Sequence, residues 1–234
     1  MLLLRPATSR LAPSYLQMTT EEQRLVIRKE MLDKRSQLSA SQLDSAGDSL
    51  ANRIEKISSD WKKPATNTDD PITVAGYLAI GGEIPLDESL SRLRQQGMST
   101  CVPVIQGDKM RFAPLTDDTV LVTGKYGIKI PEYNTDELLD ASALTVILAP
   151  LVAFDNSGNR IGMGGGYYDR TFAHLHPDQD NGANNTQSQE QKLIGVAHDF
   201  QNLDSVPVES WDVPLKMVIT DHNTYLFAAR ENHP

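Results

Sequence analysis

The feature that most constrains the fold of this 234-residue chain is the stretch 143–175, where an apolar run, a glycine-rich loop and a helical pattern follow one another. Residues 143–154 are nearly all apolar and rich in Val, Ile and Leu, which is typical of a strand buried on both faces. Residues 155–159 then carry turn chemistry. Four glycines that allow a ligand to approach the backbone closely come next: Gly162, Gly164, Gly165 and Gly166.

A glycine loop that leads into a helix directs several backbone N–H groups at one place, where the helix dipole also favours an anion. The alternative is a flexible surface turn, because the loop matches neither a Walker A motif nor, with Tyr167 in place of a glycine, the dinucleotide fingerprint. Two neighbours favour a phosphate site. Arg160 can fork onto phosphate oxygens, and Asp169 can hold a magnesium ion that a nucleotide brings.

Composition excludes several other classes of protein. The net charge of −9 argues against general binding of nucleic acid or anionic membranes, and no apolar run is long enough to span a bilayer. The single cysteine, Cys101, excludes an internal disulfide framework and fits a reducing cytoplasm. Residues 1–18 are expected to be a disordered extension, although their basic, acid-poor composition is also that of an organellar transit peptide.

The remainder, residues 19–234, is expected to form one domain in which helices and strands alternate. Apolar strands without strict alternation predict a three-layer α/β/α fold with a largely parallel sheet. Residues 178–191 are rich in Asn, Gln and Asp, and they are expected to be a mobile insertion without a packed role. The expected helices are 19–37, 39–57 and 87–96, and the expected strands are 73–80, 100–105, 110–115, 192–198 and 216–221.

The first expected helix carries three arginines, Arg24, Arg28 and Arg35, on one face. Periodicity alone favours a solvated basic stripe. His198 and Cys101, which could suggest catalysis, are expected to pack in the core.

The segment RIGMGGGYYDR (160–170), preceded by LAPLVAFD (148–155), resembles the signature of the 5-formyltetrahydrofolate cyclo-ligase family, also called 5,10-methenyltetrahydrofolate synthetases. Further family features recur in order from about residue 22 to residue 221. The resemblance implies the three-layer fold of the sugar-phosphate isomerases. It also implies an ATP- and Mg²⁺-dependent enzyme that converts 5-formyltetrahydrofolate to 5,10-methenyltetrahydrofolate, with phosphorylation of the formyl oxygen followed by attack of N10.

The resemblance assigns roles to residues of this chain. The basic residues Arg24 and Arg28 match positions that bind the phosphates of ATP, and Asp169 with Asp212 would hold magnesium. Leu78 and Glu83 match positions that contact the folate. The full expected ATP site is Arg24, Arg28, Arg160, Gly162, Met163, Gly164, Gly165, Gly166, Tyr167 and Tyr168. The expected folate site is Leu78, Glu83, Met163, Gly164, Gly165, Gly166 and Tyr167, and the expected catalytic residues are Arg160, Tyr167 and Asp169.

Three positions depart from the family pattern. Arg24 replaces the usual lysine, Leu86 replaces a threonine and Ile130 replaces a glutamate. Two other functions stay open: a different enzyme on the same fold, such as an isomerase, and a folate-binding module without ATP turnover. A monomer that binds a reduced formyl folate, and neither nucleic acid nor membrane, is the expected state.

Overall fold

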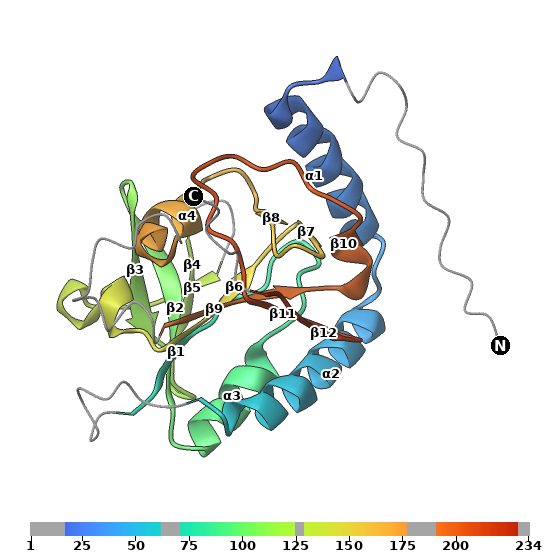
Figure 1. The fold of residues 1–234 in the computed structure, drawn as a ribbon. Helices are drawn as coiled ribbons and strands as arrows, with labels where there is room; N and C mark the ends of the chain where they lie inside the picture. Colours follow the sequence, from blue (N-terminus) through green and yellow to red (C-terminus); the bar gives the residue numbers. More distant parts are fainter. Residues whose placement is uncertain (1–16, 62–70, 125–128, 177–190, 229–234) are drawn as a thin grey trace.

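The computed structural model describes residues 17–61, 71–124, 129–176 and 191–228. Within these ranges seven strands form the main sheet, in the order β12-β11-β9-β6-β1-β2-β3 (Figure 1). The pairs formed among β2, β1, β6, β9 and β11 are all parallel, whereas the edge strands β3 and β12 pair antiparallel. The protein is therefore a mixed α/β structure around a largely parallel sheet, as the sequence predicts.

The strands of this sheet are short. In chain order they are β1 (Thr73–Ala75), β2 (Ser99–Gln106), β3 (Lys109–Pro114), β6 (Val146–Pro150), β9 (Lys192–Ala197), β11 (Met217–Thr220) and β12 (Thr224–Leu226). Two predictions need correction here. The strand expected over 73–80 ends at Ala75, and β12 is an additional strand that follows the one expected to be last.

Three long helices begin where the sequence predicts. Helix α1 (Thr20–Ser36) starts with a capping box between Thr19 and Glu22, and α2 (Ala40–Ser58) starts with one between Ser39 and Gln42. Helix α3 (Asp87–Gln95) ends before Gly97, whose φ of +83° suits the turn that follows.

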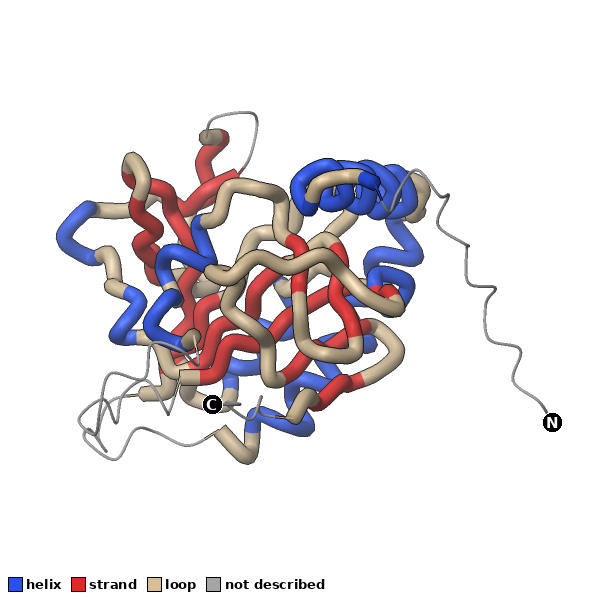
Figure 2. The backbone as a smooth tube through the Cα atoms, turned by 45° about the horizontal axis from the view of Figure 1, so that its top comes forward, coloured by secondary structure: helices blue, strands red, loops and turns tan. Residues whose placement is uncertain are grey.

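The two faces of the main sheet are covered differently. Helices α2 and α3 pack on one face, where Leu50, Ile54 and Leu90 join the core with Val74 and Leu148. The other face is covered by the short helix α4 (Tyr167–Thr171), the 3₁₀ turn Ala173–Leu175 and the segment around Val213–Leu215. In Figure 2 the strands lie in front of α2 and α3, and α1 stands apart from them at the top right.

The apolar run expected to be one strand divides between two sheets. After β6 the chain enters β7 (Ala153–Asp155), which pairs with β8 (Arg160–Ile161) and β10 (Asn202–Leu203) in a three-stranded sheet. The buried carboxylate of Asp155 accepts hydrogen bonds from the backbone N–H groups of Ser157 and Val206, which fixes the turn before the glycine loop. Helix α1 packs on this small sheet through Ile27 and Met31.

Other expectations concern the hairpins and the insertion. Strands β2 and β3 form the predicted hairpin, and Cys101 is a buried, free thiol. Strands β4 (Leu121–Thr123) and β5 (Lys129–Pro131) pair antiparallel in a separate two-stranded sheet, in which Ile130 is the partner of Val122.

Residues 1–16 and most of the expected insertion lie outside the described residues. Gln191, which the sequence placed in that insertion, is instead anchored by hydrogen bonds to the carbonyls of Ala141 and Leu144.

None of the helices in the described ranges is long and apolar enough to cross a membrane.

Candidate active site

The glycine loop has a backbone that side chains would disrupt. Gly164 and Gly166 have φ values of +95° and +64°, a region that other residues rarely adopt. A Cβ on Gly164 would lie 3.4 Å from Cζ of Arg28, and one on Gly166 would lie 2.6 Å from Nη1 of Arg170. The loop is therefore held between two guanidinium groups that approach its backbone directly.

The helix after the loop is shorter than the sequence predicts. Helix α4 has five residues, Tyr167–Thr171, and continues only as a 3₁₀ turn. A helix of this length has a small dipole, so any attraction for an anion must come mainly from the loop amides and the nearby arginines.

Helix α1 lies against the glycine loop, which is the arrangement that a shared phosphate site requires. The Nε of Arg28 donates to the carbonyl oxygen of Gly162 at 2.9 Å. Its Nη1 lies 2.8 Å from the carboxylate of Glu21, whose side chain is 63% exposed. Arg28 thus faces the loop, and its exposed partner Glu21 can be displaced by an anion of higher charge, such as a phosphate group.

Arg24, one turn before Arg28, binds a different segment. Its Nε donates to the carbonyl oxygen of Pro207 at 3.1 Å, and its two terminal nitrogens contact the carboxylate of Asp212. That carboxylate also accepts a hydrogen bond from the N–H of Glu209 at 2.8 Å. The Arg24–Asp212 ion pair is largely buried, so it holds the segment 207–212 on α1.

Arg160 and Asp169 form a second ion pair next to the first. The Nη2 of Arg160 lies 2.6 Å from Oδ1 of Asp169, and Nη1 donates to the carbonyl oxygen of Val213. The N–H of Val213 donates to the same Oδ1 at 3.2 Å. Because Val213 follows Asp212 directly, the two acids predicted to bind magnesium lie on neighbouring segments.

These pairs bear on the predicted metal site. No group of three or more His, Cys, Asp or Glu side chains within the described ranges could hold a metal ion. Asp169 keeps its Oδ2 without a hydrogen-bond partner among the described residues, whereas both oxygens of Asp212 contact Arg24. A carboxylate has about four lone-pair positions, so both acids retain capacity for a cation. Magnesium suits such a sparse set because it keeps several waters and takes further oxygens from phosphates.

Glu83 lies in a tight turn that follows β1. Its Oε2 accepts a hydrogen bond from the N–H of Ile80 at 3.0 Å, and its Oε1 lies 3.5 Å from Nη2 of Arg35. Burial raises the pKa of Glu83 above its ordinary value, although Ile80 and Arg35 partly oppose the shift. Leu78, the other predicted folate contact, is half-buried just before this turn, and Leu86 is a buried residue at the start of α3.

Two buried polar side chains that the sequence did not assign to the site hold the Glu83 turn. Arg35, from the last turn of α1, donates to the carbonyl oxygens of Gly81 at 3.0 Å and Ile80 at 2.8 Å. His198 lies 2.9 Å from the carbonyl oxygen of Gly82, and because a carbonyl only accepts, Nε2 of His198 carries the hydrogen. The sequence did contain a sign that Arg35 belongs near the site, because Arg35 lies on the same helix face as Arg24 and Arg28.

Tyr77 lies next to the Glu83 turn, where its hydroxyl donates to the carbonyl oxygen of Ile84 at 2.9 Å. Burial raises the pKa of both Tyr77 and Tyr168, and the negative charge of Glu83 raises both further. Tyr168 also stacks on Phe172, with ring centroids 6.1 Å apart. Met163, on the glycine loop, is 57% exposed.

The fold and these contacts define an α/β protein whose first helix contacts both the glycine loop and the Glu83 turn. A profile of the 5-formyltetrahydrofolate cyclo-ligase family matches residues 20–221. Among its relatives, the 5-formyltetrahydrofolate cyclo-ligase of Escherichia coli K12 is 34% identical over 151 residues, which are 63% of this chain and 77% of the relative. The enzyme of the same name from Haemophilus influenzae is 30% identical over 197 residues, 83% of this chain and 95% of the relative.

A solved structure has the same fold. The NMR structure of Aquifex aeolicus 5,10-methenyltetrahydrofolate synthetase superimposes with a TM-score of 0.64 at 24% identity, covering 90% of this chain and 96% of that one. The protein belongs to the 5-formyltetrahydrofolate cyclo-ligase family, as the glycine-loop motif predicts, and it is an enzyme of that class.

Proposed function

We propose that this protein converts 5-formyltetrahydrofolate to 5,10-methenyltetrahydrofolate with consumption of ATP in the presence of Mg²⁺. Family membership supports the folate conversion. The ATP dependence is supported by the position of Arg28 against the glycine loop. Its Nε donates a hydrogen bond to the carbonyl oxygen of Gly162, and its guanidinium lies beside Gly164. A cation against exposed loop amides is a site for phosphate oxygens.

The chemistry asks little of the protein beyond positioning and charge stabilisation. The N5-formyl group is an amide and a poor electrophile, so its oxygen first takes the terminal phosphoryl group of ATP, and ADP leaves. N10 then attacks the formyl carbon and loses its proton to solvent, and inorganic phosphate leaves with the former formyl oxygen. Neither step needs a nucleophilic side chain, and the site accordingly offers arginines, loop amides and carboxylates.

We assign the two halves of the site as follows. Arg28 and the glycines bind the phosphates, and Arg24 and Arg160 hold Asp212 and Asp169 in place within reach of them. Asp169 and Asp212 would hold magnesium, and the bound cation would neutralise part of the negative charge of the phosphates. Glu83 presents its carboxyl group to the folate, with Leu78, Met163 and Tyr167 lining the space between.

The proposal extends to the state of the protein. Residues 19–234 would form a single domain with the fold of the sugar-phosphate isomerases, and the enzyme would act as a cytoplasmic monomer. The buried free thiol of Cys101 suits a reducing compartment.

The test follows the absorbance of the methenyl product after 5-formyltetrahydrofolate is added with and without Mg-ATP. We expect product only when Mg²⁺ and ATP are both present. Product formation at the same rate without ATP would exclude phosphorylation of the formyl oxygen. Binding of folate without any product would support a binding module instead.

A further inference from the structure

The two tryptophans of the chain have opposite environments. Trp61, which follows α2, is 6% exposed and packs in the core on the α2 side of the main sheet. Trp211 is 64% exposed, although hydrogen bonds fix the backbone around it. An indole is one of the largest apolar surfaces that a side chain can bury, so an open indole on a fixed segment offers stabilisation that a bound ligand would gain.

Trp211 lies in a closed turn of residues 209–212, which we call the Trp211 turn. The N–H of Asp212 donates to the carbonyl oxygen of Glu209 at 3.1 Å, and the N–H of Glu209 donates to Oδ2 of Asp212 at 2.8 Å. The carboxylate of Asp212 is held in turn by Arg24 of α1 in a largely buried ion pair. The turn is therefore attached to α1, and the indole is presented to solvent from a rigid backbone.

The Trp211 turn lies next to the proposed phosphate site. Trp211 directly precedes Asp212, one of the two proposed magnesium ligands, and successive Cα atoms are only about 3.8 Å apart. On α1, Leu25 is also exposed, and it lies one turn before Arg28 on the same side of the helix. An exposed apolar side chain therefore follows Arg24 on α1, and another precedes its ion-pair partner on the turn.

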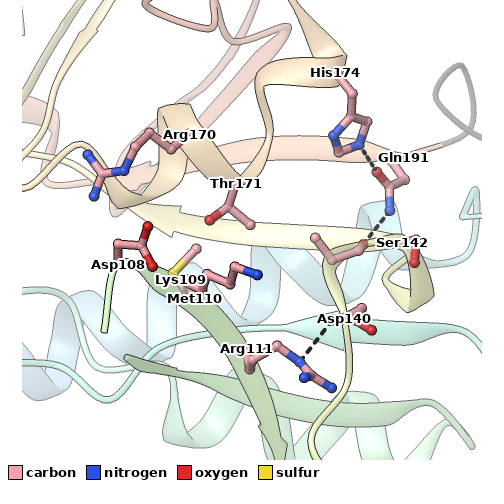
Figure 3. Close-up of a pocket in the computed structure, with 11 residues that line it drawn as sticks. Asp108, Lys109, Met110, Arg111, Asp140, Ser142, Arg170, Thr171, His174 and Gln191 are labelled. Carbon is pink, nitrogen blue, oxygen red and sulfur yellow. Dashed lines mark hydrogen bonds and ion pairs between the residues drawn. The ribbon is translucent and has the colours of Figure 1, made fainter. Parts of the chain in front are cut away.

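A cavity of about 580 Å³ is the alternative place for the apolar part of a nucleotide. It lies between α4, the start of β3 and the segment that precedes β6 (Figure 3). The described residues that line it are mostly charged or polar and include no Trp, Tyr or Phe. Its one imidazole, that of His174, lies 2.7 Å from the side-chain oxygen of Gln191 (Figure 3). This lining favours polar groups, so the Trp211 turn is the better surface for a flat aromatic base.

We propose that Trp211 binds the purine base of the nucleotide by stacking, with Leu25 packed against the edge of the same base. This inference rests on the proposed function, which assigns residues to the phosphates and to magnesium but none to the base. ATP is charged at one end and flat and aromatic at the other, and the two ends require different surfaces. Arg28 and the loop amides provide the first surface, and Trp211 with Leu25 provides the second. Stacking recognises a planar ring and reads no hydrogen-bond pattern, so this contact would accept other purine nucleotides as well.

Isothermal titration calorimetry with Mg-ATP and with Mg-tripolyphosphate, which has the phosphates but no base, tests this inference. Trp211→Ala should weaken the binding of Mg-ATP about tenfold, the size expected for one stacked base, and leave the binding of Mg-tripolyphosphate unchanged. Trp211→Phe, which keeps an aromatic ring, should recover most of the loss. Tryptophan fluorescence gives a second measurement: Mg-ATP should quench the emission of the wild-type protein but not that of Trp211→Phe, in which only the buried Trp61 remains.

Leu25 and Val26 provide a matched pair of variants on α1, because both side chains are exposed. Val26 lies about 160° around the helix from Arg28, on its far side. Leu25→Ala should weaken the binding of Mg-ATP about threefold, as expected for a partly buried apolar contact, and Val26→Ala should bind Mg-ATP as the wild-type protein does.

Thermal melts establish that the variants are folded. A Trp211→Ala protein that binds Mg-ATP as tightly as the wild type would overturn the inference and leave the proposed function intact. An equal loss of affinity for Mg-ATP and Mg-tripolyphosphate would also overturn it, because the turn would then act on the phosphates or the metal. The same holds if Trp211→Phe binds Mg-ATP as weakly as Trp211→Ala, since an aromatic ring would then not be what binds. A wild-type protein that binds neither ligand would overturn the proposed function as well.

Discussion

Two arginines of helix α1, Arg28 and Arg35, have opposite roles. At the middle of the helix, Arg28 faces the glycine loop and pairs with Glu21, a carboxylate that is 63% exposed. In its last turn, Arg35 is 2% exposed and donates to two backbone carbonyls of the Glu83 turn. The first arrangement can be exchanged for a ligand because water replaces Glu21 at little cost. The second cannot, since the carbonyls and the charge would be left buried and unpaired.

This comparison teaches that one helix serves both halves of the site. Its middle brings the exchangeable charge of Arg28 to the loop, and its last turn fixes the turn that carries Glu83. Substitutions near the loop should therefore change activity, whereas substitutions at the end of the helix should change stability.

The largest effect is expected at Asp169, which Arg160 and the N–H of Val213 hold beside the loop. Asp169→Ala should lower kcat about a thousandfold, because it removes a carboxylate from the proposed magnesium site. The protein should remain folded, as judged by circular dichroism. Near-normal turnover in this variant would show that the metal assignment is wrong.

The next effect concerns Arg35. Arg35→Met should lower the free energy of unfolding by about 3 kcal/mol, because the charge of Glu83 and two carbonyls lose their buried partner. Urea denaturation measures this, and Arg35→Lys, which keeps the charge, should recover part of the loss. An Arg35→Met protein as stable as the wild type would remove the distinction between Arg28 and Arg35.

A smaller effect is expected at Asp221, whose carboxylate lies 3.8 Å from Nδ1 of His198. Burial alone would raise the pKa of Asp221, but the nearby imidazoles of His198 and His222 and the hydrogen bond from the N–H of Asp199 outweigh it and lower the pKa from 3.8 to about 2. A lowered pKa stabilises the fold above about pH 4, and this contribution is lost as the pH falls towards 2.

Asp221→Asn should therefore reduce stability at pH 7 by about 1 kcal/mol, after allowance for solvent screening. The difference from the wild type should vanish below about pH 2. Unfolding midpoints measured between these pH values check the prediction, and a difference that stays constant with pH would contradict it.

The smallest effect is expected at Glu21. Glu21→Gln removes an exposed partner of Arg28, so stability should change by less than about 0.5 kcal/mol. The affinity for Mg-ATP should rise slightly, because Arg28 no longer has to leave a carboxylate. A large loss of affinity would mean that Glu21 positions Arg28 instead of competing for it.

The sequence predicted the family, the largely parallel sheet and the capped starts of α1 and α2, because these depend on local motifs and on apolar periodicity. It placed a single strand where β6 and β7 enter different sheets, since apolar composition does not reveal where a chain changes sheet. It also expected a longer helix after the glycine loop than the five residues of α4.

Long-range pairing limited the prediction of the site. The sequence grouped Arg24, Arg28 and Arg35 on one helix face, but it could not show that Arg24 pairs with Asp212. Nor could it show that Arg35 and His198 hold the Glu83 turn from distant segments. Such pairs join residues far apart in the chain, and only the folded arrangement of the loops brings them together.

The most direct test of the account is the affinity of Arg28→Ala for Mg-ATP, measured by titration calorimetry beside Lys29→Ala. Lys29 is an exposed neighbour on α1, so its variant controls for the loss of one positive charge. We predict that Arg28→Ala binds Mg-ATP about a hundredfold more weakly, as expected for a charged hydrogen-bonding group on phosphate, and that Lys29→Ala binds as the wild type does. Equal affinity of the two variants would contradict the proposal that α1 and the glycine loop form the nucleotide site.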